Sequence, residues 1–509
     1  MTNPTRSPES LWLDGVGAPV RPALDGDLSV DVAVIGGGIV GLTTALLLKR
    51  GGASVAVVEA GRIGHGVTGH STAKVSSLHG LVYGEITARF GERAARIYGE
   101  ANEAAIERIA GFVEEERIDC DFERAPAFVY TESQGEADAL RQEAAIARGL
   151  GLPASYVEEV ELPWGPPAAL RFDRQAQFDP YRYLLALAAA VPGEGSHVLE
   201  GTRALAVTED EPCRVRTATG SIVAGDVIVA THLPFLDRGA FFARTHPERS
   251  YVLGVRVDPR AEVEGMYLST ESPAHTVRRV QARAGRRGGM LLVGGEGHKV
   301  GQGGDTAERV RRLEAWARAR FPVREVEHRW SSQDNMPIDG LPFVGLFTPL
   351  STRLYTATGM RKWGITNGTA AAMILSDSIL KRPNLWSEVF DARRVKPLAS
   401  ASSFVRENVN VGRRFVADRL VRPRRDPASE MGPGEAAVLR DGARSVAVSR
   451  ADDGSVSAVS AVCPHLGCLV RWNSAETSWD CPCHGSRFDR EGRLLQGPAV
   501  RDLDSVELS

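Results

Sequence analysis

Two short loops in the C-terminal part of the chain place two cysteines and two histidines close together. The first loop reads Cys463-Pro-His465, and the second, after fifteen intervening residues, reads Cys481-Pro-Cys-His484. Two thiolates and two imidazoles suit a [2Fe-2S] cluster with two cysteine ligands on one iron and two histidine ligands on the other. Tetrahedral zinc also accepts this ligand set, so a structural zinc site is the alternative. The single residue between Cys463 and His465 is shorter than usual zinc spacing and favours the cluster.

A nucleotide-binding pattern lies near the N-terminal end. The apolar run 29–35 predicts a buried strand, and it leads directly into Gly36, Gly38 and Gly41, which match G-x-G-x-x-G. These glycines permit a tight turn, close approach of the backbone to a pyrophosphate, and packing of a helix on the strand. A second strand ends at Glu59, whose carboxylate can accept hydrogen bonds from a ribose diol. The pattern predicts a dinucleotide site and leaves FAD and NAD as alternatives.

At full length, the two C-terminal loops resemble those of a Rieske domain. They read Cys463-Pro-His465-Leu-Gly-Cys468 and Cys481-Pro-Cys483-His484-Gly-Ser486. Rieske proteins of cytochrome bc-type complexes have the same pattern, with Thr at the position of Pro464. The resemblance implies that Cys463, His465, Cys481 and His484 bind the cluster and that a disulfide between Cys468 and Cys483 ties the loops together. A zinc site would leave the last two cysteines without a role.

Later segments resemble FAD-dependent oxidoreductases. Residues 226–231, Asp-Val-Ile-Val-Ala-Thr, are similar to a strand of glutathione-reductase-like flavoproteins. Residues 334–345 and 355–368 resemble the closing motif of the D-amino-acid-oxidase, or glycine/sarcosine-oxidase-like, superfamily. In that superfamily the helix starting near Gly364 directs its N-terminus at the flavin, where its dipole stabilises the negative charge of the reduced ring. The resemblance covers residues 28 to 395 patchily and implies FAD.

The same resemblance implies further site residues. Besides the glycine loop and Glu59, the expected FAD contacts are Thr72, Ala73, Thr231, Gly359, Gly364 and Ile365. The candidate catalytic residues are His70, Lys74 and Arg361; a purely structural role is the alternative for each. His70 lies eleven residues after Glu59, like the histidine that carries FAD covalently in dimethylglycine- and sarcosine-dehydrogenase-like flavoproteins, but Gly69 stands where those have Trp. A non-covalent flavin contact is therefore the alternative. Arg361 could pair a substrate carboxylate, neutralise an FAD phosphate or lie in solvent.

The pattern between the motifs predicts the architecture. Helical spacing over residues 91–117 predicts a helix, and strand-like stretches at 197–207, 214–223, 251–257 and 290–293 predict an antiparallel substrate-facing sheet. We expect an α/β Rossmann-like FAD-binding lobe interleaved with an α+β substrate lobe, plus a small all-β Rieske domain. The expected boundaries are 1–395 for the oxidoreductase domain (FAD lobe 28–80, 171–235 and 330–395; substrate lobe 81–170 and 236–329), 396–430 for a linker with a helix near 403–420, and 431–509 for the Rieske domain.

Composition excludes several other classes. The chain has 509 residues, of which 43% are hydrophobic and 25% charged, as in an ordinary multidomain globular protein. No apolar run reaches the ~18 residues of a membrane span, and the first residues lack a secretory signal, so we expect a cytoplasmic protein without an integral membrane segment. A formal net charge of −3 offers no basic excess for nucleic acid. Cys120 and Cys213 are expected to be buried, inert thiols.

These observations predict an FAD-dependent oxidoreductase. We expect it to dehydrogenate a small amine or amino-acid-like substrate and to pass electrons from flavin to the Rieske [2Fe-2S] cluster, and on to an acceptor protein or quinone. Two alternatives remain open: a reductase in which an external donor feeds the cluster and then the flavin, and a non-catalytic redox sensor. The lack of a second dinucleotide motif counts against direct reduction by NAD(P)H.

Overall fold

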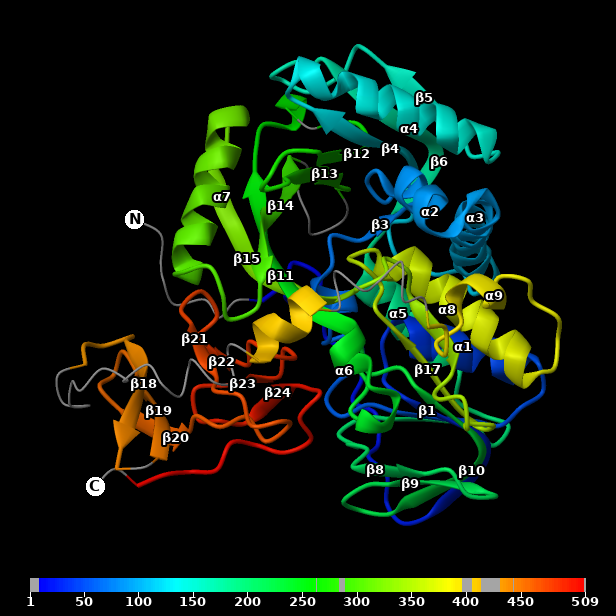
Figure 1. Cartoon of the computed structure of the whole chain (residues 1–509), viewed down its shortest axis with the longest axis vertical. Coiled ribbons are helices and arrows are strands. Elements are labelled where there is room, and N and C mark those ends of the chain that lie inside the picture. Colours follow the sequence, from blue (N-terminus) through cyan, green and yellow to red (C-terminus); the bar gives the residue numbers. More distant parts are fainter. Residues whose placement is uncertain are drawn as a thin grey trace.

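The computed structural model describes residues 9–261, 263–282, 289–395, 405–412, 431–442 and 444–507. Two large sheets and two small ones organise these residues (Figure 1). Of the expected linker, the structure describes only residues 405–412, which are helical; the remainder of 396–430 lies outside the described residues. No helix among the described residues has both the length and the apolar character needed to cross a bilayer.

The first sheet builds the predicted FAD lobe. Its main order is β16 (Phe343–Leu346), β17 (Leu354–Thr358), β10 (Ser221–Val229), β1 (Leu28–Ile35), β2 (Val55–Val58) and β7 (His197–Leu199), with β8 (Ala206–Thr208) and β9 (Cys213–Arg216) attached to β10. Strand β1 pairs in parallel with β10 and β2, so their carboxyl ends lie at one edge of the sheet. Helix α1 (Ile39–Arg50) packs against α5 (Pro180–Ala190) and α8 (Gly364–Ile379). This topology brings the turns that follow β1, β2 and β10 together.

The second sheet builds the substrate lobe. Its order is β15 (Glu325–Pro337), β11 (Thr245–Arg256), β14 (Met290–Lys299), β13 (Thr276–Val280), β12 (Met266–Ser269), β4 (Glu123–Thr131), β6 (Ala168–Gln177) and β3 (Lys74–Val75), with β5 (Ala154–Val157) beside β6. Besides α1, α5 and α8, the structure has the helices α2 (Val82–Phe90), α3 (Glu92–Glu115), α4 (Ala137–Gly149), α6 (Phe241–Arg244), α7 (Thr306–Arg320) and α9 (Ser387–Phe390). Short 3-10 turns are η1 (Thr68–His70), η2 (Gln134–Glu136), η3 (Asp237–Gly239) and η4 (Pro259–Ala261).

The structure confirms some predicted elements and corrects others. The helix predicted at 91–117 is α3, and its apolar positions from Ile97 to Phe112 are buried. The prediction that the stretches 197–207 and 214–223 belong to the substrate-facing sheet is wrong, since they contribute to β7, β8, β9 and β10 of the first sheet. A half-buried alternating pattern shows that one face of a strand is covered, but not which sheet the strand joins. Residues 171–177 and 330–337 fall within the segments expected in the FAD lobe, but they lie in β6 and β15 of the second sheet.

The C-terminal domain contains the two small antiparallel sheets (orange to red in Figure 1). One consists of β18 (Ala436–Asp441), β19 (Arg444–Arg450) and β20 (Val456–Ser460), and the other of β21 (Arg471–Asn473), β22 (Ser478–Asp480), β23 (Arg487–Phe488) and β24 (Leu494–Gln496). The two cysteine- and histidine-containing loops connect β20 to β21 and β22 to β23. Trp479 and Phe488 form a buried core beneath them.

Candidate functional site

A cavity of about 1190 Å³ lies where the two lobes and the C-terminal domain meet. Its wall includes the glycine loop after β1, the segment around η1, the middle parts of β11, β14 and β15, and residues 494–500 of the C-terminal domain. Pockets for single small ligands usually measure about 300–1,000 Å³. This cavity therefore has room for a dinucleotide cofactor together with a small substrate.

The glycine loop at one end of the cavity accepts only glycine at two positions. Gly36 has a φ of +116°, and a Cβ there would lie 2.4 Å from the carbonyl oxygen of Ala230. A Cβ on Gly41 would lie 1.9 Å from the carbonyl oxygen of Gly36. The first glycine thus permits the turn from β1 into α1 beside the end of β10, and the last permits the close packing of α1. Gly36 and Gly38 present their backbone to the cavity.

Glu59 closes the same end of the cavity. Its two carboxylate oxygens accept hydrogen bonds from the backbone N–H groups of Gly37, at 2.8 Å, and Gly61, at 2.9 Å. Burial raises the pKa of Glu59, and the two backbone donors oppose that shift. Each oxygen keeps acceptor capacity on the cavity side, as a ribose diol requires.

The N-terminus of α8 forms another part of the wall. Gly364 and Ile365 line the cavity, and no side chain caps this end of the helix. Trp363 stacks on His79 with 4.6 Å between ring centroids, which fixes the turn before the helix. Exposed backbone N–H groups at a helix start stabilise negative charge. The glycine loop, the acid after β2 and this helix N-terminus together fit FAD.

The structure brings most of the predicted flavin-site residues into this cavity. Those that line it are Gly36, Gly38, Glu59, His70, Thr72, Ala73, Lys74, Thr231, Gly364 and Ile365. Gly41, Gly359 and Arg361 do not line it. Gly359 has a φ of +73° and acts through the backbone turn that follows β17.

Arg361 does not face the candidate substrate space. Its guanidinium donates to Glu85 and, at 3.0 Å, to the carbonyl oxygen of Gly340. The next residue, Lys362, lines the cavity instead and pairs with Glu248 at 2.8 Å. The residue types alone do not reveal which of two adjacent basic side chains turns inward.

Lys74 is buried and His70 half-buried at the cavity wall. The Nδ1 atom of His70 lies 2.8 Å from the carbonyl oxygen of Gly66, and burial lowers the pKa of His70. The ammonium of Lys74 contacts the hydroxyl of Thr276 and, at 3.4 Å, the carbonyl oxygen of Tyr267. Burial, assisted by the charge of Arg278, lowers the pKa of Lys74 to about 7. Lys74 can therefore be a neutral amine near physiological pH.

The four candidate cluster ligands lie together at the tip of the C-terminal domain. Cys463 and Cys481 are each 1% exposed, and a hydrogen bond from the Cys481 thiol lowers the pKa of Cys463 to about 7. The rings of His465 and His484 have centroids 5.0 Å apart and planes at 89°. Burial lowers the pKa of His484 to about 3, so its imidazole is neutral, the form that binds metal.

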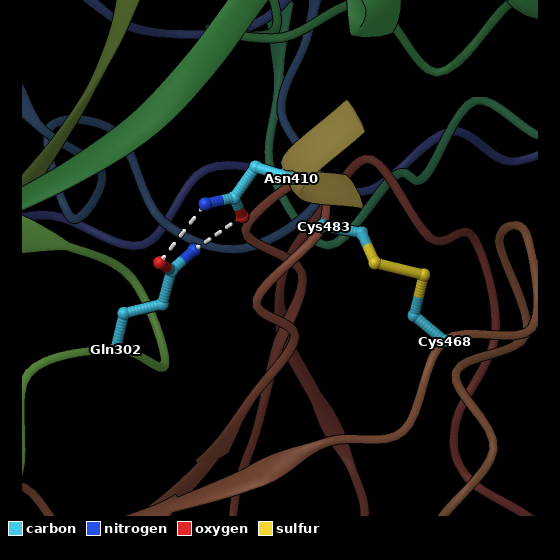
Figure 2. Close-up of a disulfide and its surroundings, with 4 residues drawn as sticks. All are labelled: Gln302, Asn410, Cys468 and Cys483. Carbon is cyan, nitrogen blue, oxygen red and sulfur yellow. Dashed lines mark hydrogen bonds between the residues drawn. A yellow bond between two sulfur atoms is a disulfide. The ribbon is translucent and has the colours of Figure 1, made fainter. Parts of the chain in front are cut away.

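The two ligand loops have matching backbone geometry. The N–H of Cys463 donates to the carbonyl of Cys468 at 2.9 Å, and that of Cys481 donates to the carbonyl of Ser486 at 2.8 Å. A disulfide joins Cys468 to Cys483 with 6.5 Å between the Cα atoms (Figure 2). The sulfurs of Cys468, Cys481 and Cys483 lie within 4.8 Å of one another. Since two of these are bonded to each other, Cys481 remains as a ligand.

The two ring nitrogens of His465 also indicate a metal ligand. Its Nε2 lies 3.0 Å from Oδ1 of Asp237, which belongs to η3 of the oxidoreductase domain. Its Nδ1 is buried and has no hydrogen-bond partner among the described residues. A buried, unpaired nitrogen beside two buried thiols fits iron ligation, so the donor set fits a [2Fe-2S] cluster with two histidine ligands.

Comparison with known families accounts for both parts of the chain. Residues 31–378 match the family model described as FAD dependent oxidoreductase, and residues 424–507 match that of the Rieske [2Fe-2S] domain. The protein YhfW of Bacillus subtilis (strain 168), named for a Rieske 2Fe-2S centre, is 34% identical over 99% of this chain and 98% of its own length. The cytochrome b6-f complex iron-sulfur subunit 1 of a Nostoc species is 53% identical over 45 residues, covering 9% of this chain and 25% of that protein.

Solved structures share the fold of the oxidoreductase domain. Glycine oxidase from Geobacillus kaustophilus superimposes with a TM-score of 0.60 at 19% identity, covering 72% of this chain and 99% of that one. L-proline dehydrogenase from P. horikoshii also gives 0.60, at 20% identity, covering 73% and 98%. The cofactors that these families imply are FAD and a [2Fe-2S] cluster, and both fit the sites described above. The chain therefore belongs to the FAD-dependent oxidoreductase family and carries a C-terminal Rieske [2Fe-2S] domain.

Proposed function

We propose that this oxidoreductase dehydrogenates a small amine or amino-acid-like substrate and exports the electrons singly through its Rieske cluster to an acceptor protein or quinone. The observation that carries the proposal is the shared cavity: the glycine loop and residues 494–500 of the Rieske domain line the same space. The shared wall supports direct electron exchange between the two cofactor sites of one chain. Electron export through the cluster then needs no second protein between flavin and cluster.

The substrate class is supported by the solved relatives and by the cavity itself. The similar solved structures include a glycine oxidase, an L-proline dehydrogenase and an L-amino acid deaminase. Beside the flavin-site residues, the cavity wall has polar groups for a small substrate, including Lys74, Thr276, Glu248 and Lys362. Because Lys362 is paired with Glu248, a substrate carboxylate would have to compete with that pair.

Lys74 is the residue proposed to take the proton from the substrate. Bound FAD supplies the hydride acceptor, and the hydride leaves most readily from a carbon next to a neutral nitrogen. Lys74 contacts Thr276 at the cavity wall and is neutral for part of the time near pH 7. It accepts the N–H proton of a substrate ammonium, the substrate C–H bond then breaks, and an iminium C=N bond forms.

Anaerobic mixing with a panel of amines and amino acids tests the proposal. An accepted substrate bleaches the flavin first, and the EPR signal of the reduced cluster follows. A matched variant, His484→Cys, keeps the flavin site, so bleaching should persist while the cluster signal changes. No bleaching with any amine would contradict the substrate class. Cluster reduction by an external donor ahead of the flavin would favour the reductase direction instead.

A further inference from the structure

The Rieske domain is attached to the oxidoreductase domain by a buried ionic cluster. Arg249 on β11 is 1% exposed, and its guanidinium lies 3.1 Å from Glu476 and 3.2 Å from Asp480, both in the Rieske domain. Arg487 binds the same two acids from within the Rieske domain. Separation of the domains would leave Arg249 without these partners, which opposes undocking.

A second contact connects the flavin cavity directly to a ligand loop. Gln333, on β15 in the cavity wall, donates from Nε2 to the carbonyl oxygen of Gly485 at 2.8 Å. Its Oε1 accepts from Arg249 at 2.9 Å. Gly485 follows the ligand His484, has a φ of +79°, and a Cβ there would lie 2.3 Å from Nε2 of Gln333 and 2.9 Å from Pro247. The ligand loop is thus packed against β15 without space between them.

The helix at residues 405–412 also contributes contacts to the interface between the Rieske and oxidoreductase domains. Glu407 pairs with Lys299, and the amides of Asn410 and Gln302 exchange hydrogen bonds of 3.0 and 3.4 Å (Figure 2). Val411 packs on the Rieske core that contains the disulfide. One helix therefore contacts both domains.

The histidine edge of the cluster site faces inward. The ring of Phe242, on α6, lies 5.3 Å from His484 and 6.0 Å from His465 between centroids. Each histidine side chain is 5% exposed. An outside protein cannot reach these rings while the domains are docked.

We propose that the Rieske domain works from this single docked position, and that Gln333 is the positioning residue that holds the ligand loop against the flavin cavity for electron exchange. The inference rests on the proposed function, because it requires that flavin and cluster exchange electrons. In each transfer the reduced flavin loses one electron and the oxidised cluster gains one. The external acceptor then takes the electron from a face of the domain other than the histidine edge.

A disulfide cross-link that holds the two domains in the docked position tests the first part of the proposal. The hydroxyl oxygens of Thr306, on α7, and Ser474, in the Rieske domain, lie 3.0 Å apart, so Thr306→Cys with Ser474→Cys places two thiols within disulfide reach. We expect the pair to cross-link in the holoprotein. After photochemical reduction of the flavin, the cluster of the cross-linked protein should be reduced at a rate within about twofold of that of the same variant before the cross-link forms. The effective concentration of the cluster at the flavin is unchanged in that case. Failure to cross-link, or a loss of about tenfold or more on locking, would overturn the single-position proposal.

Gln333 is tested by two substitutions and a matched control. Gln333→Glu keeps an acceptor for Arg249 but cannot donate to Gly485, and Gln333→Leu removes both contacts. Both should slow cluster reduction by about tenfold or more, since small misplacements of reacting groups are costly, and should change the cluster EPR signal. Because Gln333 lines the flavin cavity, FAD content and flavin photoreduction are measured in each variant, and the rate of cluster reduction is compared per reduced flavin. Gln302→Leu, which alters the interface away from β15, should transfer at the rate of the unmodified protein.

Wild-type transfer in both Gln333 variants would refute the role of Gln333. Because light rather than an amine reduces the flavin, the measurement is independent of the substrate proposal. If amines fail to bleach the flavin while light-driven transfer proceeds, the proposed function fails and the docking inference stands. If neither light nor an amine leads to cluster reduction, both fail.

Discussion

His465 and Asp237 join the two domains at the cluster site, with Nε2 of the histidine 3.0 Å from Oδ1 of the aspartate. The histidine comes from the Rieske domain and the aspartate from η3 of the oxidoreductase domain. A carboxylate in contact with one ring nitrogen orients the ring and makes the other nitrogen a stronger ligand. Through Asp237 the oxidoreductase domain would orient a ligand of the bound cluster.

Asp237→Asn should raise the reduction potential of the cluster. The substitution removes a negative charge next to a ligand, and this favours the reduced cluster, whose charge is more negative. Asp237 is half exposed, so we expect a shift of about 59 mV or less, equivalent to a tenfold change for one electron. An EPR-monitored redox titration measures it, with Arg238→Gln as a neighbouring control. An unchanged potential would mean that the contact does not influence the cluster.

His484→Cys should retain iron and sulfide but lower the potential strongly. A thiolate adds negative charge where neutral imidazole stands. The variant would have three cysteine ligands and one histidine, so its potential should move from the Rieske range of about −150 to +300 mV toward the value near about −400 mV of clusters with four cysteine ligands. Metal and labile-sulfide analysis with a redox titration checks this. Zinc in place of iron in the unmodified protein would refute the cluster assignment itself.

Loss of the disulfide should loosen the ligand loops. Cys468→Ser or Cys483→Ser removes the bond that ties the two loops, so iron retention should fall while FAD content stays constant. The iron-to-FAD ratio during dialysis gives the measurement. Cys213→Ser, at a buried cysteine with a free thiol, is the control. Equal iron retention in all three variants would contradict a role for the bond.

Substrate oxidation should increase as the pH rises through about 7, the pKa of Lys74. Burial lowers this pKa, so the neutral amine that accepts a proton prevails above that pH and the ammonium prevails below it. Lys74→Met should abolish this limb of the profile and lower flavin reduction about 10²-fold or more. The measurement is the pH dependence of anaerobic flavin reduction. A limb that persists in Lys74→Met belongs to the substrate or to another group.

Acid precipitation should release the flavin completely. His70 already contacts Gly66 through Nδ1, and Gly69 stands where the covalent flavoproteins have tryptophan. We therefore expect a non-covalent contact, with His70→Gln lowering FAD retention on gel filtration. Yellow colour that stays with the precipitate of the unmodified protein, and is lost in His70→Gln, would establish the covalent link instead.

The site residues that a sequence can predict belong to local motifs. The glycine loop and the two ligand loops bring their residues together within a few positions, so residue types and spacing suffice. The interface could not be predicted in this way, because Arg249 and Glu476 are separated by 227 positions and look like ordinary surface charges. Arg361 and Lys362 illustrate a second limit. Both have positive φ, at 54° and 66°, and only the folded turn determines which side chain enters the cavity.

The wall formed by residues 494–500 also has a consequence for synthesis. A growing chain that has emerged as far as residue 395 contains the glycine loop, Glu59 and α8, yet the space beside them still lacks its last wall. Domains generally fold from the N-terminus as they leave the ribosome. The flavin pocket should then remain open to solvent until residues 494–500 have been made and the Rieske domain has docked, so stable FAD uptake would follow the synthesis of that domain.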